Sequence, residues 1–328
     1  MEERLPGKAH SEIKKVIDGL ASWMQQGYSD TLGYTPAWNA AYFSSKTNNF
    51  PLFRYEMRAG FYKEEAGAGK ESRFTITVND LSTLQQSFLL NGNSYGLVLP
   101  MKQLYNGILY NETTSDKSDT ATASRMTRNW LITYADSLPY TVVSRKEYLQ
   151  QAEKEISADK EALRQQMMQL MPVKSAAEEE ATIKREISEI ENMYSGIMRT
   201  NRTRMYLESY VPDSVYFKEA FTRKSAGLDA DSLMLDSMLL KSSAKDLAKP
   251  AYVSVPAISF KNFEDGMPGS RMLIKWNLNY FSKTISLARP QFIAVTWQYD
   301  PADNSAKAID KQLMGKLELC DLASLLGK

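Results

Sequence analysis

The stretch SLARPQFIAVTWQYD, residues 286–300, carries the clearest strand pattern of the chain. Apolar residues occupy every second position from 293 onward, which places them on one face of an extended strand: Ile293, Val295, Trp297 and Tyr299. Because the tryptophan is in register with aliphatic residues, we interpret its ring as core packing rather than as a ligand-stacking surface. The stretch therefore predicts a strand with one face in a hydrophobic core.

Similar alternation predicts further strands at 73–80, 129–143 and 271–281, and a strand interrupted by proline at 250–260. Trp276 receives the same core interpretation as Trp297. In FRYEMRAGFY, residues 53–62, aromatic and aliphatic residues alternate with Arg54, Glu56 and Arg58, which predicts a sheet with one solvated face. The glycines of residues 64–71 predict a hairpin turn that pairs 53–62 with 73–80 in antiparallel fashion.

Three-residue and four-residue apolar spacing predicts a first helix from Ser11 to Gln26, ended by Gly27. GYTPAWNAAYF, residues 33–43, is typical of a second, short helix with Thr35 as its cap and Pro36 in its first turn. A polar loop is expected from Asn111 to Ser124.

Two longer apolar rows predict helices from Ser144 to Leu170 and from Ala176 to Met198. Pro172 lies between them, so we expect a long antiparallel helical hairpin with a tight turn. The hairpin either packs on itself and the body or projects as an arm toward a partner, and another helix is expected within 232–250.

Strands on both sides of the hairpin predict an α+β fold with a mainly antiparallel sheet and flanking helices. The chain divides into residues 1–143 with a helix and strands, 144–202 with the hairpin, and 203–328 with a helix and strands. Whether the two groups of strands form one sheet or two domains stays open at this point.

The chain has 328 residues, with 40 basic and 39 acidic side chains and a net charge of +1. This balance argues against nucleic acid as a partner, because no overall field attracts a polyanion. No apolar run approaches the length of a transmembrane helix. The start MEERLPG resembles a chain whose leader has been trimmed, so we expect a periplasmic or extracellular protein, with a cytoplasmic one as the alternative.

Catalysis that depends on histidine is disfavoured, because His10 is the single histidine and precedes the first helix. We expect the only cysteine, Cys320, to be a buried, inert thiol in a helix. GAGKE at 67–71 lacks the glycine and the hydroxyl residue of a phosphate-binding loop. No metal site and no cofactor are predicted.

Two groups of side chains are candidate ligand-binding residues. Tyr28, Tyr34, Trp38 and Tyr42 lie outside the strand register and would form either an exposed platform for a sugar or peptide, or a small core under a loop. Glu56 between Arg54 and Arg58 is either one carboxylate of a glycosidase-type pair or part of a charge ladder on a solvated face.

LPYTVVSRKEYLQ, residues 138–150, and NLNYFSKTISLARPQFIAVTWQYD, residues 277–300, resemble stretches in a group of uncharacterised exported proteins of Bacteroidetes. In that group a strand leads into an SRKEYL helix, and a YF turn precedes a PQF strand. The resemblance implies a cell-envelope setting and assigns no active-site residue.

These observations favour an exported, non-enzymatic binding or interaction protein for carbohydrate or a protein partner. One alternative is a carbohydrate-active hydrolase with a carboxylate pair. Another is an envelope assembly subunit that engages a partner through the hairpin, which predicts exposed apolar residues there, such as Met193, Ile197 or Met198.

Overall fold

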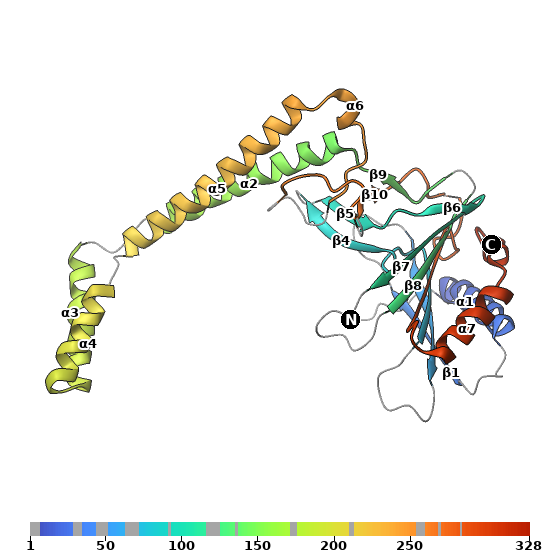
Figure 1. Cartoon of the computed structure of the whole chain (residues 1–328), viewed down its shortest axis with the longest axis horizontal. Coiled ribbons are helices and arrows are strands. Elements are labelled where there is room, and N and C mark those ends of the chain that lie inside the picture. Colours follow the sequence, from blue (N-terminus) through green and yellow to red (C-terminus); the bar gives the residue numbers. More distant parts are fainter. Residues whose placement is uncertain are drawn as a thin grey trace.

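The computed structural model describes residues 7–28, 35–43, 52–62, 72–90, 93–115, 125–134, 137–170, 176–209, 213–253, 260–267, 270–282 and 284–328. These residues form two antiparallel sheets, helices beside one of them, and a long helical arm that leaves the body (Figure 1). The expected α+β fold with mainly antiparallel sheet is confirmed.

The larger sheet has seven strands in the order β1-β2-β3-β11-β8-β7-β6, and each neighbouring pair is antiparallel. Its strands are β1 (Thr35–Phe43), β2 (Arg54–Tyr62), β3 (Ser72–Val78), β6 (Lys102–Tyr105), β7 (Ile108–Ser115), β8 (Arg125–Ile132) and β11 (Ile293–Tyr299). The quoted stretch supplies β11, which lies in the middle between β3 and β8. Strands from before and after the helical arm therefore belong to one sheet.

Helices α1 (Gly7–Gly27), α7 (Asn304–Lys316) and α8 (Leu319–Ala323) cover one face of this sheet. Their apolar sides enclose a core centred on Trp297, which has no exposed surface. The ring centroid of Trp297 lies 5.6 Å from that of Phe61 and 6.1 Å from that of Phe74. The predictions of a first helix and of core packing by Trp297 are confirmed.

The smaller sheet has the order β4-β5-β10-β9, with strands β4 (Gln85–Leu90), β5 (Asn93–Val98), β9 (Tyr140–Val142) and β10 (Met272–Trp276). A second cluster joins it to the other face of the larger sheet, because Leu131 and Ala294 pack in one core with Val98 and Ile274, and Trp276 packs against this core. The expectation of one solvated face was wrong: the second face of the larger sheet is partly covered.

The helical arm consists of α2 (Arg145–Leu170), α3 (Ala176–Met193), α4 (Gly196–Ser209) and α5 (Asp213–Lys241), and the short helix α6 (Ala244–Leu247) follows at its base. α2 leads away from the body and α5 returns beside it, while α3 and α4 form a second pair at the far end (Figure 1). No helix among the described residues is sufficiently long and apolar to span a membrane.

The predicted partner of α2 was wrong, because α2 packs along α5 and not along the helix that begins at Ala176. The apolar row of α2 is met by Leu228 and Leu235 of α5, which are buried in the same core cluster. The chain also breaks after Met193, where Gly196 has a φ of 56°. The hairpin therefore extends past position 202 to Lys241.

The short helix expected within 33–43 is not formed by the described part of this stretch. Residues 35–43 are β1, and all nine pair with β2. Pairing along the whole strand satisfies the backbone and overrides the helix preference of the three alanines. Likewise, Asn111–Ser115 belong to β7 rather than to a loop, and 116–124 lie outside the described residues.

Candidate functional site

The structure describes only some of the side chains of the four aromatic candidate residues. Tyr28 is half-buried, and its ring packs edge to face on Phe61 of the large-sheet core, with centroids 5.0 Å apart. The register sets Trp38 opposite Ala59 and Tyr42 opposite Tyr55. The side chains of Trp38 and Tyr42, and all of Tyr34, lie outside the described residues.

Arg54, Glu56 and Arg58 lie on β2, as expected, but Glu56 is buried, with 5% of its surface exposed. Arg58 Nη2 lies 2.7 Å from Glu56 Oε1, and Arg54 Nη1 lies 3.9 Å from Asp80 Oδ1. The carboxylate of Glu56 is thus held by an arginine on its own strand. Within the described ranges, no group of three or more His, Cys, Asp or Glu side chains could hold a metal ion.

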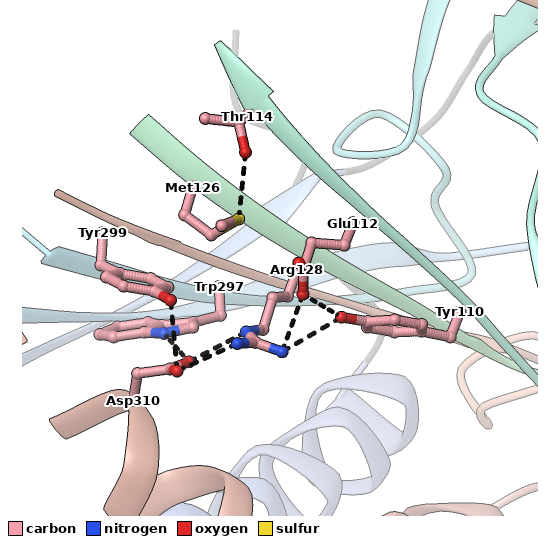
Figure 2. A network of polar contacts seen from close by, with 8 residues as sticks. All are labelled: Tyr110, Glu112, Thr114, Met126, Arg128, Trp297, Tyr299 and Asp310. Atoms are coloured by element: carbon pink, nitrogen blue, oxygen red, sulfur yellow. Dashed lines mark hydrogen bonds and ion pairs between the residues drawn. The ribbon is translucent and has the colours of Figure 1, made fainter. Parts of the chain in front are cut away.

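A polar network that the sequence did not indicate joins α7 to the large sheet (Figure 2). The buried carboxylate of Asp310 accepts hydrogen bonds from Trp297 Nε1 at 3.0 Å and from the Tyr299 hydroxyl at 3.3 Å. Arg128 Nη2 donates to the same carboxylate at 3.1 Å. Because each of these donors comes from the sheet, the network holds the middle of α7 against β8 and β11.

Arg128 also connects this carboxylate to β7. Its Nη1 lies 2.8 Å from Glu112 Oε2 and donates to the Tyr110 hydroxyl at 3.2 Å (Figure 2). Burial alone would lower the pKa of Arg128, but its hydrogen bond with Tyr299 and the charge of Asp310 raise it above the ordinary value. Burial and the hydrogen bond to Glu112 raise the pKa of Tyr110 to about 12. Arg128 therefore stays charged and Tyr110 stays neutral, as a structural clamp requires.

A cavity of about 410 Å³ lies beside the C-terminal end of α7. Phe74, Trp130 and Val295 of the sheet contribute apolar surface to it, and Glu318 and Cys320 line it from the α8 side. Cys320 is exposed, so the prediction of a buried thiol was wrong. The reason is that α8 has only five residues and buries Leu322 alone. The lining of this cavity mixes apolar with polar surface, so its volume is the only property of its described lining that would suit a ligand.

The base of the helical arm is firmly attached to the smaller sheet. Tyr148 and Leu149 at the start of α2 are fully buried with Leu273 of β10. Lys275 of β10 donates to Glu147 at 2.6 Å. The arm is therefore anchored at its root by both apolar and ionic contacts.

Burial decreases along the arm toward its far end. The last buried residue of α2 is Leu163 and the first of α5 is Leu228. Among the side chains that the structure describes between 164 and 227, none is buried. We call the α3–α4 pair the tip. Because two helices alone cannot enclose a core, the stability of the tip depends on half-buried contacts such as those of Ile183, Ile187 and Ile190.

Large apolar side chains are exposed where α3 turns into α4. The exposed fractions are 66% for Met193, 81% for Ile197 and 61% for Met198, which we call the turn cluster. Met205 and Leu207 of α4 are also exposed, so residues 193–207 hold five of the fifteen exposed large apolar side chains in the described chain. This concentration at the end of a projecting arm is typical of an interaction surface.

The two tip helices carry opposite charge. α3 has six acidic and two basic residues, whereas α4 has three arginines and one acidic residue. Some of these charges have local contacts: Lys184 lies 2.6 Å from Glu180 in an ion pair, and Arg202 lies over the ring of Tyr194 in a cation–π contact. The tip thus has an acidic helix beside a basic one.

Comparison with known proteins yields no matching family model, no similar curated protein and no similar solved structure.

Proposed function

We propose that this protein is a non-enzymatic interaction protein that binds a protein partner through the tip of its helical arm. The single observation that carries the proposal is the turn cluster, in which Met193, Ile197 and Met198 are exposed at the end of the arm. Exposed apolar residues on the hairpin are what the assembly-subunit hypothesis predicts.

The architecture supports the same function. α2 has 26 residues, which at a rise of 1.5 Å per residue gives a length of about 39 Å. Its root is buried on the smaller sheet while its far end has no buried side chain among the described residues. An element anchored in this way presents its end at a distance from the body, where a partner can reach all sides of it.

The composition of the turn cluster suits the binding of a protein surface. Methionine has three rotatable bonds and a polarizable sulfur, so it adapts to irregular apolar surfaces. A buried isoleucine or methionine contributes roughly 1.5–3 kcal/mol relative to an exposed one. Covering these three side chains would therefore contribute several kcal/mol to the free energy of binding.

The test is site-specific photo-cross-linking in the cells from which the chain comes. A photoreactive phenylalanine analogue replaces Ile197 in the turn cluster or, as a matched control, Lys224 on the exposed surface of α5. We expect discrete cross-linked products from position 197 and none from position 224, with the attached polypeptide identified by mass spectrometry. Equal or absent cross-linking at the two positions would overturn the proposal.

A cell-envelope setting remains part of the proposal, supported by the resemblance of residues 138–150 and 277–300 to exported proteins.

The carbohydrate hypothesis stays tied to Trp38, whose side chain lies outside the described residues. Its test is a glycan-binding screen of the wild type and Trp38→Ala. For the hydrolase alternative, Glu56 is paired with Arg58 rather than with another carboxylate in the contacts described above.

A further inference from the structure

We infer that the partner of the tip is a second copy of this chain, and that two tips form an antiparallel four-helix bundle. This inference rests on the proposed function, because it names the partner of the same surface. It is carried by three features of the tip: its lack of buried side chains among those described, its opposite helix charges and its turn cluster.

A second tip supplies what one tip lacks. In the α3–α4 pair, Ile183, Ile187 and Ile190 are only half-buried, because two helices leave one side of each open. Four-helix bundles enclose such rows completely, with axes of neighbouring helices 8–10 Å apart. Docking two tips face to face would bury these isoleucines in a core of four helices.

The charges favour a like partner. A two-fold interface uses the same surface on both copies, so that surface must be complementary to itself. An acidic helix beside a basic helix meets this condition when α3 of one copy lies against α4 of the other. Glu189 and Glu191 near the end of α3 would then lie at the level of the partner's Arg199 and Arg202.

The charge pattern also selects the direction of the two-fold axis. With the axis parallel to the tip helices, α3 faces the partner's α4, and both turns lie at the same end of the bundle. With the axis perpendicular to the helices, the two tips point in opposite directions. In that arrangement α3 of one copy faces α3 of the other, so two acidic helices lie against each other. The structure therefore assigns the parallel axis, which brings the turn clusters of both copies together.

Position 195 in the turn distinguishes the two arrangements. In the assigned bundle the two turns are separated by about one helix-to-helix distance, roughly 10 Å. In the opposite arrangement they are separated by about the length of α3, which is 18 residues or roughly 27 Å. A bis-maleimide linker of intermediate reach therefore joins Ser195→Cys only in the assigned bundle.

The first experiment uses the full chain with Cys320→Ser, which removes the exposed native thiol. Light scattering during size-exclusion chromatography measures the mass, and the expected value is twice 37.2 kDa. In the Cys320→Ser protein, Ser195→Cys should cross-link into a covalent dimer. Ser225→Cys lies on the α2–α5 pair, here called the shaft, and should give no cross-linking above that of the Cys320→Ser protein. A monomer over the whole concentration series, or a dimer that Ser195→Cys does not cross-link, would overturn the inference.

Charge reversal gives an independent test that does not depend on cysteine. Arg199→Glu/Arg202→Glu makes both tip helices acidic and should abolish the dimer; Glu189→Lys/Glu191→Lys should do the same by placing basic groups against α4. An equimolar mixture of the two variants should restore the doubled mass, because each supplies the charge that the other lacks. Circular dichroism verifies that each variant keeps its helices, and a mixture that stays monomeric contradicts the pairing.

The two proposals fail in different ways. A monomer in solution whose position 197 cross-links to a different polypeptide in cells overturns self-association and leaves the interaction function standing. A monomer with no cross-link at position 197 overturns both.

Discussion

At the scale of single residues, Asp310 is the side chain on which the polar contacts of α7 depend. Its carboxylate accepts hydrogen bonds from Trp297, Tyr299 and Arg128, and the charge of Arg128 is largely buried with it. Removing one member of a buried ion pair costs more than removing an exposed pair, because the remaining charge is left without compensation.

Asp310→Asn should therefore lower the free energy of unfolding by about 2–4 kcal/mol. The matched control is Asp18→Asn, which breaks the exposed pair with Lys14 and should cost less than about 0.5 kcal/mol. Urea denaturation followed by tryptophan fluorescence measures both values. Equal losses in the two variants would show that the network contributes nothing beyond a surface pair.

Because Tyr140 is buried, we expect the free energy of unfolding to fall in alkaline solution. Burial raises its pKa to about 12 in the folded protein, whereas an unfolded tyrosine ionises near pH 10. Its contribution is thus fully present below pH 10 and is lost as the pH rises toward 12, by about 2 kcal/mol. In urea titrations at several pH values, Tyr140→Phe should show a smaller decrease than the wild type; parallel curves would contradict this assignment.

The sequence predicted the core residues better than the polar ones. Trp297 was assigned to the core because it shares a strand face with the aliphatic residues Ile293 and Val295. Asp310 had no such signal. Arg128 is 182 residues away in the sequence and reaches it only through the strand order, and the local pattern does not indicate that the carboxylate faces Trp297. Cys320 was misassigned because its apolar neighbours suggested burial, although α8 is too short to cover it.

At the scale of elements, the pairing of α2 with α5 is open to a direct test. Leu235 is fully buried between the helices of the shaft, whereas Leu233 on the same helix is 70% exposed. Leu235→Ala should lower the free energy of unfolding by about 2–4 kcal/mol, because it leaves a cavity. Leu233→Ala should change it by less than about 0.5 kcal/mol. Similar values for the two variants would contradict this orientation of α5.

The turn between α3 and α4 depends on one glycine. Gly196 has a φ of 56°, and an added Cβ would meet no neighbouring atom, so only the backbone conformation opposes substitution. Gly196→Ala should destabilise the tip by about 1 kcal/mol. Gly227→Ala in α5 also meets open space but has no such φ, and should stabilise its helix by up to about 1 kcal/mol.

Hydrogen exchange resolved by peptide measures both changes. Protection of 176–209 should fall in Gly196→Ala and stay unchanged in Gly227→Ala. A rise in the protection of 176–209 in Gly227→Ala would contradict this expectation and indicate that α5 and the tip unfold together.

The element predictions failed where tertiary pairing outweighs the local pattern. Thr35 in a capping position and Pro36 in a first turn suggested a helix, but nine backbone pairs with β2 make residues 35–43 a strand. Helix spacing identified α2 and the start of α3 correctly. It gave no information on their partners, because a proline at position 172 is compatible with a hairpin and with two successive helix pairs. The break at Gly196 was hidden within a continuous apolar row.

At the scale of the whole molecule, the body and the tip should be energetically separate. No described side chain between 164 and 227 is buried, and of the described residues in this segment only Phe221 of α5 packs against one of the three cores. Replacing 171–212 with a short glycine-serine linker should therefore leave the melting temperature of the body within about 2–4 °C of the wild type. Calorimetry measures this change, and a larger decrease would show that the tip stabilises the body.

The order of the seven strands has a consequence for how the chain is made. β3 ends at Val78, but its neighbour β11 begins only at Ile293, about 215 residues later. At a synthesis rate of roughly 5–20 residues per second, the edges of β3 and β8 wait on the order of 10–40 s for the strand that joins them. During this interval they are open to pairing with other chains. A chain that ends before Ile293 should accordingly aggregate, and the nascent protein should depend on chaperones until β11 has left the ribosome.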